Sequence, residues 1–192
     1  MNGKLILVSG YCATGKSTFS RNLSRQLGIP CFNKDTIKES MADGFGAESK
    51  EVEFMGSRAT FRVMAHVAEC FLKIGKACIL EANFKPQEGE QLDELAKRHG
   101  AECLTFVFTG DLDVLYDRYV KREDAGERHW VHMSAGLRES FRDMHVQYNV
   151  GQIAVGQTVN IDSTVFENVE YEKFYEIAGA FVKEGQHAEN NY

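Results

Sequence analysis

The sequence predicts an α/β fold in which helices cover both faces of a parallel β-sheet. Short apolar runs typical of buried strands alternate with longer segments whose apolar residues recur every three or four positions, as on one face of a helix. The chain has 192 residues, with no internal repeat and no Pro- or Ser-rich linker. Strands that alternate with helices favour a parallel sheet, because each parallel connection needs a crossover of helical length.

Five strands are expected from the apolar runs. They are Lys4–Ser9, Pro30–Asp35, Ala77–Ala82, Glu102–Phe108 and Gln157–Asp162. Right-handed crossovers place the carboxyl ends of such strands at one edge of the sheet, where ligands bind. We therefore expect the loop after the first strand, Asp35, Glu81 and the segment after Ile161 to meet at one cleft.

Helices are expected between these strands from apolar spacing and from end signals. They run over Ser17–Leu27, Asp35–Met41, Glu51 to about Lys73, Lys85 to about Gly100, Asp111–Tyr119, Ser134–Tyr148 and Val169–Phe181. Asp35 or Thr36 is expected to cap the second helix, and Asp111 the fifth. The prediction is one domain over residues 1–184, with a small helical lid at about 118–135 and a frayed polar tail at 185–192.

The stretch from Gly10 to Ser17, Gly-Tyr-Cys-Ala-Thr-Gly-Lys-Ser, fits the Walker A pattern at every fixed position. A coincidental match would give an ordinary strand–turn–helix whose glycines only make a tight turn. The context argues otherwise, because a buried strand precedes the motif and an amphipathic helix follows it. The sequence therefore predicts a phosphate-binding loop of a three-layer P-loop NTPase fold.

The chemistry of this loop follows from its residues. Gly10 and Gly15 allow the backbone to approach phosphate oxygens, and consecutive N–H groups form an anion-binding nest at a helix N-terminus. Lys16 should reach the β- and γ-phosphates of ATP, and the Ser17 hydroxyl should bind Mg²⁺. The residues expected to bind the nucleotide are Gly10, Cys12, Ala13, Thr14, Gly15, Lys16, Ser17 and Thr18.

Two carboxylates are expected beside the loop. Asp35 ends the second strand, where it can accept a proton from a substrate hydroxyl or simply cap a helix. Glu81 ends the third strand, as a Walker B acid does, and can hold Mg²⁺ or contact the acceptor. A solvated carboxylate at a strand end is the simpler interpretation of Glu81.

Three arginines lie in and after the helix that begins at Asp111. Arg118 and Arg122 are four residues apart and share one helix face, and Arg128 follows in a charged loop. Arg122 and Arg128 are predicted to neutralise charge during phosphoryl transfer, and Arg118 to contact the nucleotide. A solvated charged face that pairs with neighbouring acids is the alternative.

Composition narrows the class of protein. The formal net charge of −6 argues against dedicated binding to long nucleic acids, although it leaves room for one local basic groove. No apolar run reaches the length of a membrane span or of a signal-peptide core. The five cysteines have no C-x-x-C spacing, which fits reduced thiols in the cytoplasm.

The chain resembles the P-loop kinases that include chloramphenicol phosphotransferase, the kinase domain of bacteriophage polynucleotide kinase, zeta-toxin-like kinases and small bacterial kinases of unassigned substrate. The resemblance covers about Lys4 to Thr164. Four segments carry it: Gly10–Thr18, Phe32–Asp35 with the helix that follows, Ile79–Phe84 and Tyr119–His129. It implies a sheet of order 2-3-1-4-5 and ATP-dependent phosphorylation of a hydroxyl, with Asp35 where these kinases place the general base. Many relatives have Asp where this chain has Glu81.

The leading hypothesis is a kinase that uses ATP and Mg²⁺ to phosphorylate a hydroxyl group of a small molecule. In a second hypothesis the acceptor is the 5′-hydroxyl of a nucleic acid, which requires a basic acceptor groove. A third is a regulatory module that binds ATP or hydrolyses it slowly. The residues around Asp43 to Phe61 match no relative closely enough to name an acceptor, and the oligomeric state is not indicated.

Overall fold

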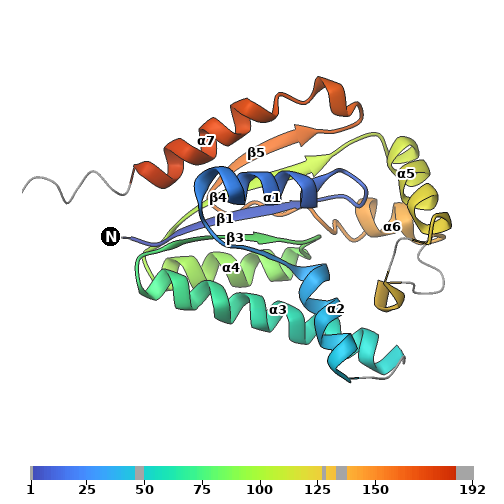
Figure 1. Ribbon diagram of the computed structural model, residues 1–192, viewed down its shortest axis with the longest axis horizontal. Coiled ribbons are helices and arrows are strands. Elements are labelled where there is room, and N and C mark those ends of the chain that lie inside the picture. Colours follow the sequence, from blue (N-terminus) through green and yellow to red (C-terminus); the bar gives the residue numbers. More distant parts are fainter. Residues whose placement is uncertain (1, 46–49, 127–128, 133–137, 185–192) are drawn as a thin grey trace, which may run out of the picture.

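The computed structural model describes residues 2–45, 50–126, 129–132 and 138–184 (Figure 1). Its centre is a sheet of five parallel strands in the order β2-β3-β1-β4-β5. The strands are β1 (Lys4–Gly10), β2 (Cys31–Asn33), β3 (Ala77–Glu81), β4 (Glu102–Thr109) and β5 (Gln157–Asp162). The expected α/β class and strand order are confirmed.

Helices cover both faces of this sheet. They are α1 (Lys16–Leu27), α2 (Lys34–Phe45), α3 (Lys50–Lys73), α4 (Pro86–Arg98), α5 (Leu112–Asp124), α6 (Phe141–Val146) and α7 (Tyr171–Lys183). Two 3₁₀ turns, η1 (Trp130–His132) and η2 (Phe166–Asn168), complete the described elements. Figure 1 shows α1 and α7 on one face and α3 and α4 on the other, with α5 and α6 beyond the carboxyl ends of the strands.

The alternation of side chains along β1 builds a core on each face. Leu5 and Leu7 pack towards α3 and α4, whereas Ile6 and Val8 pack towards α1 and α7. All seven residues of β1 are buried, as expected for the central strand of a parallel sheet. This burial fixes the end of β1, so the loop that follows starts from a rigid point.

The spacing of Phe19 and Leu23 places both on the buried face of α1. Phe19 lies against Phe106, Phe108 and Tyr175, with ring centroids 5.1–5.2 Å apart. Truncating such a residue costs about 3–5 kcal/mol because a cavity remains. The amino terminus of α1 is thereby held directly over the end of β1.

Two expectations for local structure were wrong. The second strand ends at Asn33, since α2 already begins at Lys34. Neither Asp35 nor Thr36 caps that helix: the Asn33 side chain accepts the Thr36 N–H at 2.8 Å, which leaves Asp35 in the first turn. The expected cap Asp111 is confirmed, since its carboxylate accepts from Asp113 and Val114 at 2.9 and 3.1 Å.

The expected helix Ser134–Tyr148 is much shorter in the structure. Only Phe141–Val146 form α6, preceded by a turn at 138–140, and residues 134–137 lie outside the described part of the chain. The tail at 185–192 lies outside it as well. No described helix combines the length and the apolar character needed to cross a membrane.

Candidate active site

The phosphate loop joins β1 to α1 and is shaped by three residues with positive φ. Gly10 has φ 137°, Ala13 φ 60° and Gly15 φ 84°. A Cβ at Gly10 would lie 2.1 Å from the Phe108 carbonyl oxygen, so this position requires glycine. The Tyr11 N–H donates to that same carbonyl at 2.8 Å, which ties the loop to β4.

The N–H groups from Ala13 to Ser17 donate to no acceptor within the described residues. They lie at the amino terminus of α1, where the partial positive charge of the helix adds to theirs. Five successive donors of this kind form the anion-binding nest that the sequence predicts. A triphosphate would supply the acceptors that the protein does not.

Lys16 is buried under the loop, where its ammonium donates to the Tyr11 carbonyl and to Thr14 Oγ1, the latter at 3.4 Å. Burial lowers the pKa of Lys16, while the nearby charges of Glu81 and Asp35 act in the opposite direction. A buried cation with only neutral acceptors is a strong attractor for an anion.

Glu81 ends β3 beside the loop and is 3% exposed. Its carboxylate accepts a hydrogen bond from the Asn33 amide, because β2 and β3 place these two residues side by side. Burial raises the pKa of Glu81 to about 7, against the opposing effects of Lys16 and of a hydrogen bond with Ser17. The predicted metal residues Ser17 and Glu81 therefore line the same cavity close to each other.

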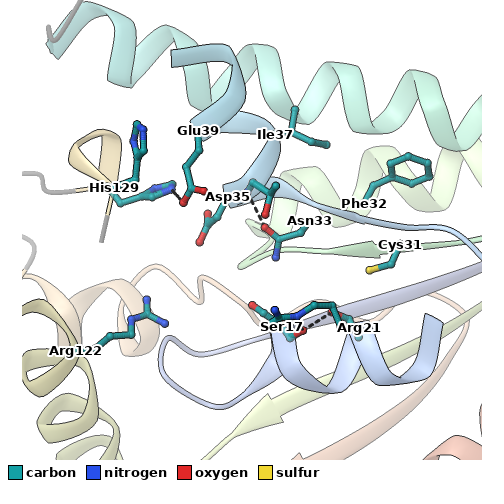
Figure 2. Close-up of a pocket in the computed structure, with 13 residues that line it drawn as sticks. Ser17, Arg21, Cys31, Phe32, Asn33, Asp35, Ile37, Glu39, Arg122 and His129 are labelled. Carbon is teal, nitrogen blue, oxygen red and sulfur yellow. Dashed lines mark hydrogen bonds and ion pairs between the residues drawn. The ribbon is translucent and has the colours of Figure 1, made fainter. Parts of the chain in front are cut away.

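A cavity of about 370 Å³ brings these groups together. Asp35 from α2 and Arg122 from α5 line it along with the phosphate loop, Lys16, Ser17, Thr18 and Glu81. A second cavity of about 470 Å³ also includes Ser17, Asp35 and Arg122 (Figure 2). Segments more than 100 residues apart thus meet at the carboxyl ends of the strands, as the fold predicts.

The segment from His129 to His132 lies against α2 through polar contacts. Lys38 donates its ammonium to the Val131 carbonyl at 2.9 Å. The His132 and His129 imidazoles lie 3.0 Å from the carboxylates of Glu39 and Asp43 respectively. Figure 2 shows His129 and Glu39 above Asp35, with Arg122 approaching from the other side. The segment from His129 to His132 therefore covers part of both cavities that contain Asp35.

Comparison with known proteins shows the family to which this chain belongs. The family profile described as an AAA domain (AAA_33) matches residues 5–142. The chain belongs to this AAA domain family. The match spans the phosphate loop, Asp35, Glu81 and both described arginines of α5, whereas His145 and the aromatic residues after β5 lie beyond it.

Solved structures share the whole fold. A protein of Chloroflexus aurantiacus J-10-fl, provisionally designated a kinase, is 25% identical with a TM-score of 0.83, covering 93% of this chain and 97% of that one. A gluconokinase from Sinorhizobium meliloti 1021 is 16% identical with a TM-score of 0.53, and the match covers 94% of this chain and 92% of that one. The APS kinase of Mycobacterium tuberculosis, solved with AMPPNP and APS, is 13% identical with a TM-score of 0.57, and the match covers 95% of this chain and 98% of that one. This AAA domain therefore has the fold of P-loop kinases.

The three predicted arginines have different surroundings. Arg122 lines both cavities that contain Ser17 and Asp35. Arg118, one turn earlier, instead donates to the Ser163 and Thr164 carbonyls at 2.8 and 2.7 Å and lies 3.9 Å from the centre of the Phe166 ring. Arg128 lies outside the described residues.

A third cavity of about 250 Å³ adjoins the phosphate loop and shares Gly15 and Thr18 with the phosphate cavity. Aromatic side chains dominate its lining, which consists of Gly15, Thr18, Phe19, Asn22, Phe166, Tyr171 and Tyr175. An apolar, aromatic slot beside a phosphate nest suits a planar base. The segment after Ile161 thus joins the site of this AAA domain from the β5 side.

Sequence reasoning missed several residues of the site. Asn33 is the last residue of β2 and Asn83 lies two residues after β3, so the rule for strand ends could have found them. The Asn83 amide lies 2.8 Å from Cys12 Sγ. Lys38, which lines the phosphate cavity, is buried and donates to the Val131 carbonyl of η1, far from it in the sequence. His145 contacts the phosphate loop from α6, and no spacing in the sequence indicates it.

Proposed function

We propose that this protein transfers the γ-phosphate of ATP, bound with Mg²⁺, to a hydroxyl group of a small molecule. The observation that carries the proposal is the shared cavity, in which the Asp35 carboxylate and the Arg122 guanidinium face the same space as the unpaired N–H groups of the loop. A protein that only binds nucleotide needs neither an acceptor-side carboxylate nor a lid arginine. Family membership supports the kinase class and leaves the acceptor open.

The loop would hold the triphosphate. Residues Ala13 to Ser17, whose N–H groups have no acceptor among the described residues, line one cavity with Thr18 of the first turn of α1, and their N–H groups would bind the phosphates together with the Lys16 ammonium. The aromatic slot beside Gly15 would take the adenine, with Arg118 stacked at its edge through Phe166. This arrangement supports a role of Arg118 in nucleotide binding, distinct from the role proposed for Arg122.

The pair Ser17 and Glu81 fits a divalent cation. Glu81 is a buried carboxylate whose raised pKa reports an unfavourable anion, and a cation beside it would relieve that cost. Among the described residues no three His, Cys, Asp or Glu side chains gather in a metal-binding group. Mg²⁺ suits such a site, because it uses few protein ligands together with phosphate oxygens and water. When bound, it would neutralise charge on the β- and γ-phosphates.

Asp35 would act on the acceptor. Its carboxylate accepts the proton of the substrate hydroxyl while the oxygen–phosphorus bond forms and the bond to the β,γ-bridging oxygen breaks, which releases ADP. Arg122 would stabilise the charge on the transferred group, with Arg128 assigned the same role from the sequence. The lid, over about 118–135 of a single domain spanning 1–184, would exclude water.

The experiment that tests this proposal is ADP release in the presence of ATP and Mg²⁺, with a panel of hydroxylated acceptors. The panel includes sugars, nucleosides, aminoglycosides, chloramphenicol and an oligonucleotide with a 5′-hydroxyl. Asp35→Asn should lower acceptor-dependent kcat at least 100-fold while the Kd for ATP stays within about threefold, since general-base catalysis contributes about 10²–10⁴-fold.

Asp93→Asn is the matched control, because Asp93 lies on α4 and pairs with Lys97 away from the cavity. It should leave kcat unchanged. A near-normal kcat for Asp35→Asn would refute the base assignment. ADP release that ignores every acceptor would point to an ATPase, and release that depends on the oligonucleotide and falls with salt would move the acceptor to nucleic acid.

A further inference from the structure

His145 lies on α6, outside every sequence motif, yet it contacts the phosphate loop directly. It is 1% exposed. Its Nε2 accepts the backbone N–H of Cys12 at 3.2 Å, and its Nδ1 lies 3.0 Å from the Val150 carbonyl oxygen. Because one partner can only donate and the other can only accept, these contacts define a neutral imidazole with its proton on Nδ1.

The surroundings of His145 hold this form in place. The ring lies 4.4 Å from Tyr11 and 5.1 Å from Phe141, measured between centroids. Burial lowers its pKa to about 4, and the nearby charge of Lys16 acts in the same direction, whereas the bond to Val150 opposes it. At neutral pH the imidazole is therefore an acceptor at Nε2.

The hydrogen bond between the Cys12 N–H and His145 lies immediately before the unpaired donors of the loop. Cys12 supplies the last N–H before the five unpaired donors that begin at Ala13. Ala13 has φ 60°, a left-handed conformation that costs a non-glycine residue about 1 kcal/mol or more unless its surroundings impose it. Fixing the peptide plane in front of Ala13 therefore fixes the direction of the donors that follow.

A second set of contacts anchors the same segment to the start of the loop. The Ser9 hydroxyl donates to the Gly151 carbonyl at 2.9 Å, and the Gly151 N–H donates to the Phe84 carbonyl at 2.8 Å. A Cβ at Gly151 would lie 2.3 Å from the Gly10 carbonyl oxygen, so the two backbones are in direct contact. The chain from α6 to Gly151 thus supports the loop from Ser9 to Ala13.

We infer that His145 is a positioning residue for the phosphate nest, which acts by accepting the Cys12 N–H and so orients the N–H groups that bind a nucleoside triphosphate. The inference rests on the proposed function for the identity of the ligand. It also explains why α6, which follows the lid in sequence, packs onto the phosphate loop in one apolar cluster with α5. His145 lines neither of the cavities that contain Asp35 and Arg122, so its effect should appear in nucleotide binding.

Two substitutions separate the two bonds of the ring. In His145→Asn the side-chain amide can still donate to the Val150 carbonyl, in the place of Nδ1, but cannot reach Cys12. In His145→Gln the longer side chain can place an acceptor near the position of Nε2. His66→Asn is the control, because His66 is an exposed residue of α3.

The measurement is the Kd for ATP with Mg²⁺ by calorimetry, alongside the midpoint of urea denaturation. His145→Asn should raise the Kd about tenfold, the effect of one lost hydrogen bond at a buried donor. His145→Gln should recover most of that loss, and His66→Asn should match the wild type. In the wild type, protonation of His145 should add to the rise in Kd as the pH falls towards about 4, so the rise over this range should be smaller in His145→Gln, which keeps the contributions of Asp35, Glu81 and ATP itself.

Other outcomes overturn the inference. His145 would be a purely structural residue if the wild type, His145→Asn and His145→Gln bound ATP with equal affinity. The same would hold if the affinity of the two variants fell only in proportion to their loss of stability. If neither variant folds, ¹⁵N NMR of the wild-type ring decides: a proton on Nε2 at pH 7 contradicts the acceptor role, and a bare Nε2 supports it. Failure of the wild type to bind ATP at all would instead refute the proposed function.

Discussion

Glu81→Gln offers a test of the site that does not depend on knowing the acceptor. In the folded protein, burial raises the pKa of the Glu81 carboxyl from its ordinary value of 4.5 to about 7. A carboxyl with a raised pKa is less favourable in its ionised form after folding, so the protein loses stability as the pH rises through this window. Gln is neutral at every pH and keeps an acceptor for the Asn33 amide.

The magnitude follows from the width of the window. One pKa unit corresponds to about 1.4 kcal/mol, so the full effect is about 3 kcal/mol, of which about 2 kcal/mol develops between pH 5 and pH 8. For a chain of this size that is a difference in Tm of about 4–8 °C. The free energy of unfolding of Glu81→Gln, measured relative to that of the wild type, should therefore be about 2 kcal/mol higher at pH 8 than at pH 5.

The assay is urea denaturation of wild type, Glu81→Gln and the exposed control Glu90→Gln at both pH values, without nucleotide. His145 has its own pH dependence, but it is present in all three proteins and cancels in the comparison. With ATP added, Glu81→Gln should lose the increase in affinity that Mg²⁺ gives the wild type. A stability difference that is the same at pH 5 and pH 8 would refute the reasoning, because it would mean that the carboxylate is not desolvated.

Two further substitutions test the loop and the nucleotide slot. Gly151→Ala should lower the free energy of unfolding by about 2–4 kcal/mol in urea denaturation, since a Cβ would clash with the Gly10 carbonyl oxygen, while Gly44→Ala should be tolerated because its Cβ meets nothing within 4 Å. A cost below about 1 kcal/mol would show that the two backbones can separate. Arg118→Ala should raise the KM for ATP about tenfold with little change in kcat, measured by steady-state kinetics with an active acceptor; a fall in kcat at constant KM would place Arg118 in the transition state instead.

The sequence by itself determined the strands, the phosphate loop and the edge at which the site forms. These features are local: burial along β1, glycines at fixed spacing and the apolar stripe of α1 all lie within a few residues of one another. The carboxyl ends of parallel strands share one edge, so Asp35 and Glu81 could be placed near Lys16 without coordinates. Even the cap at Asp111 was local enough to predict.

Only the tertiary structure decided which side chains meet across the chain. Arg118 and Arg122 share a helix face, yet one turn of separation places Arg118 against the loop after β5 and Arg122 over the phosphate cavity. The bond between His145 and Cys12 joins residues 133 positions apart, and no local pattern encodes it. The physical reason is that these contacts depend on how α5 and α6 pack on the loop, whereas secondary structure depends on neighbours in sequence.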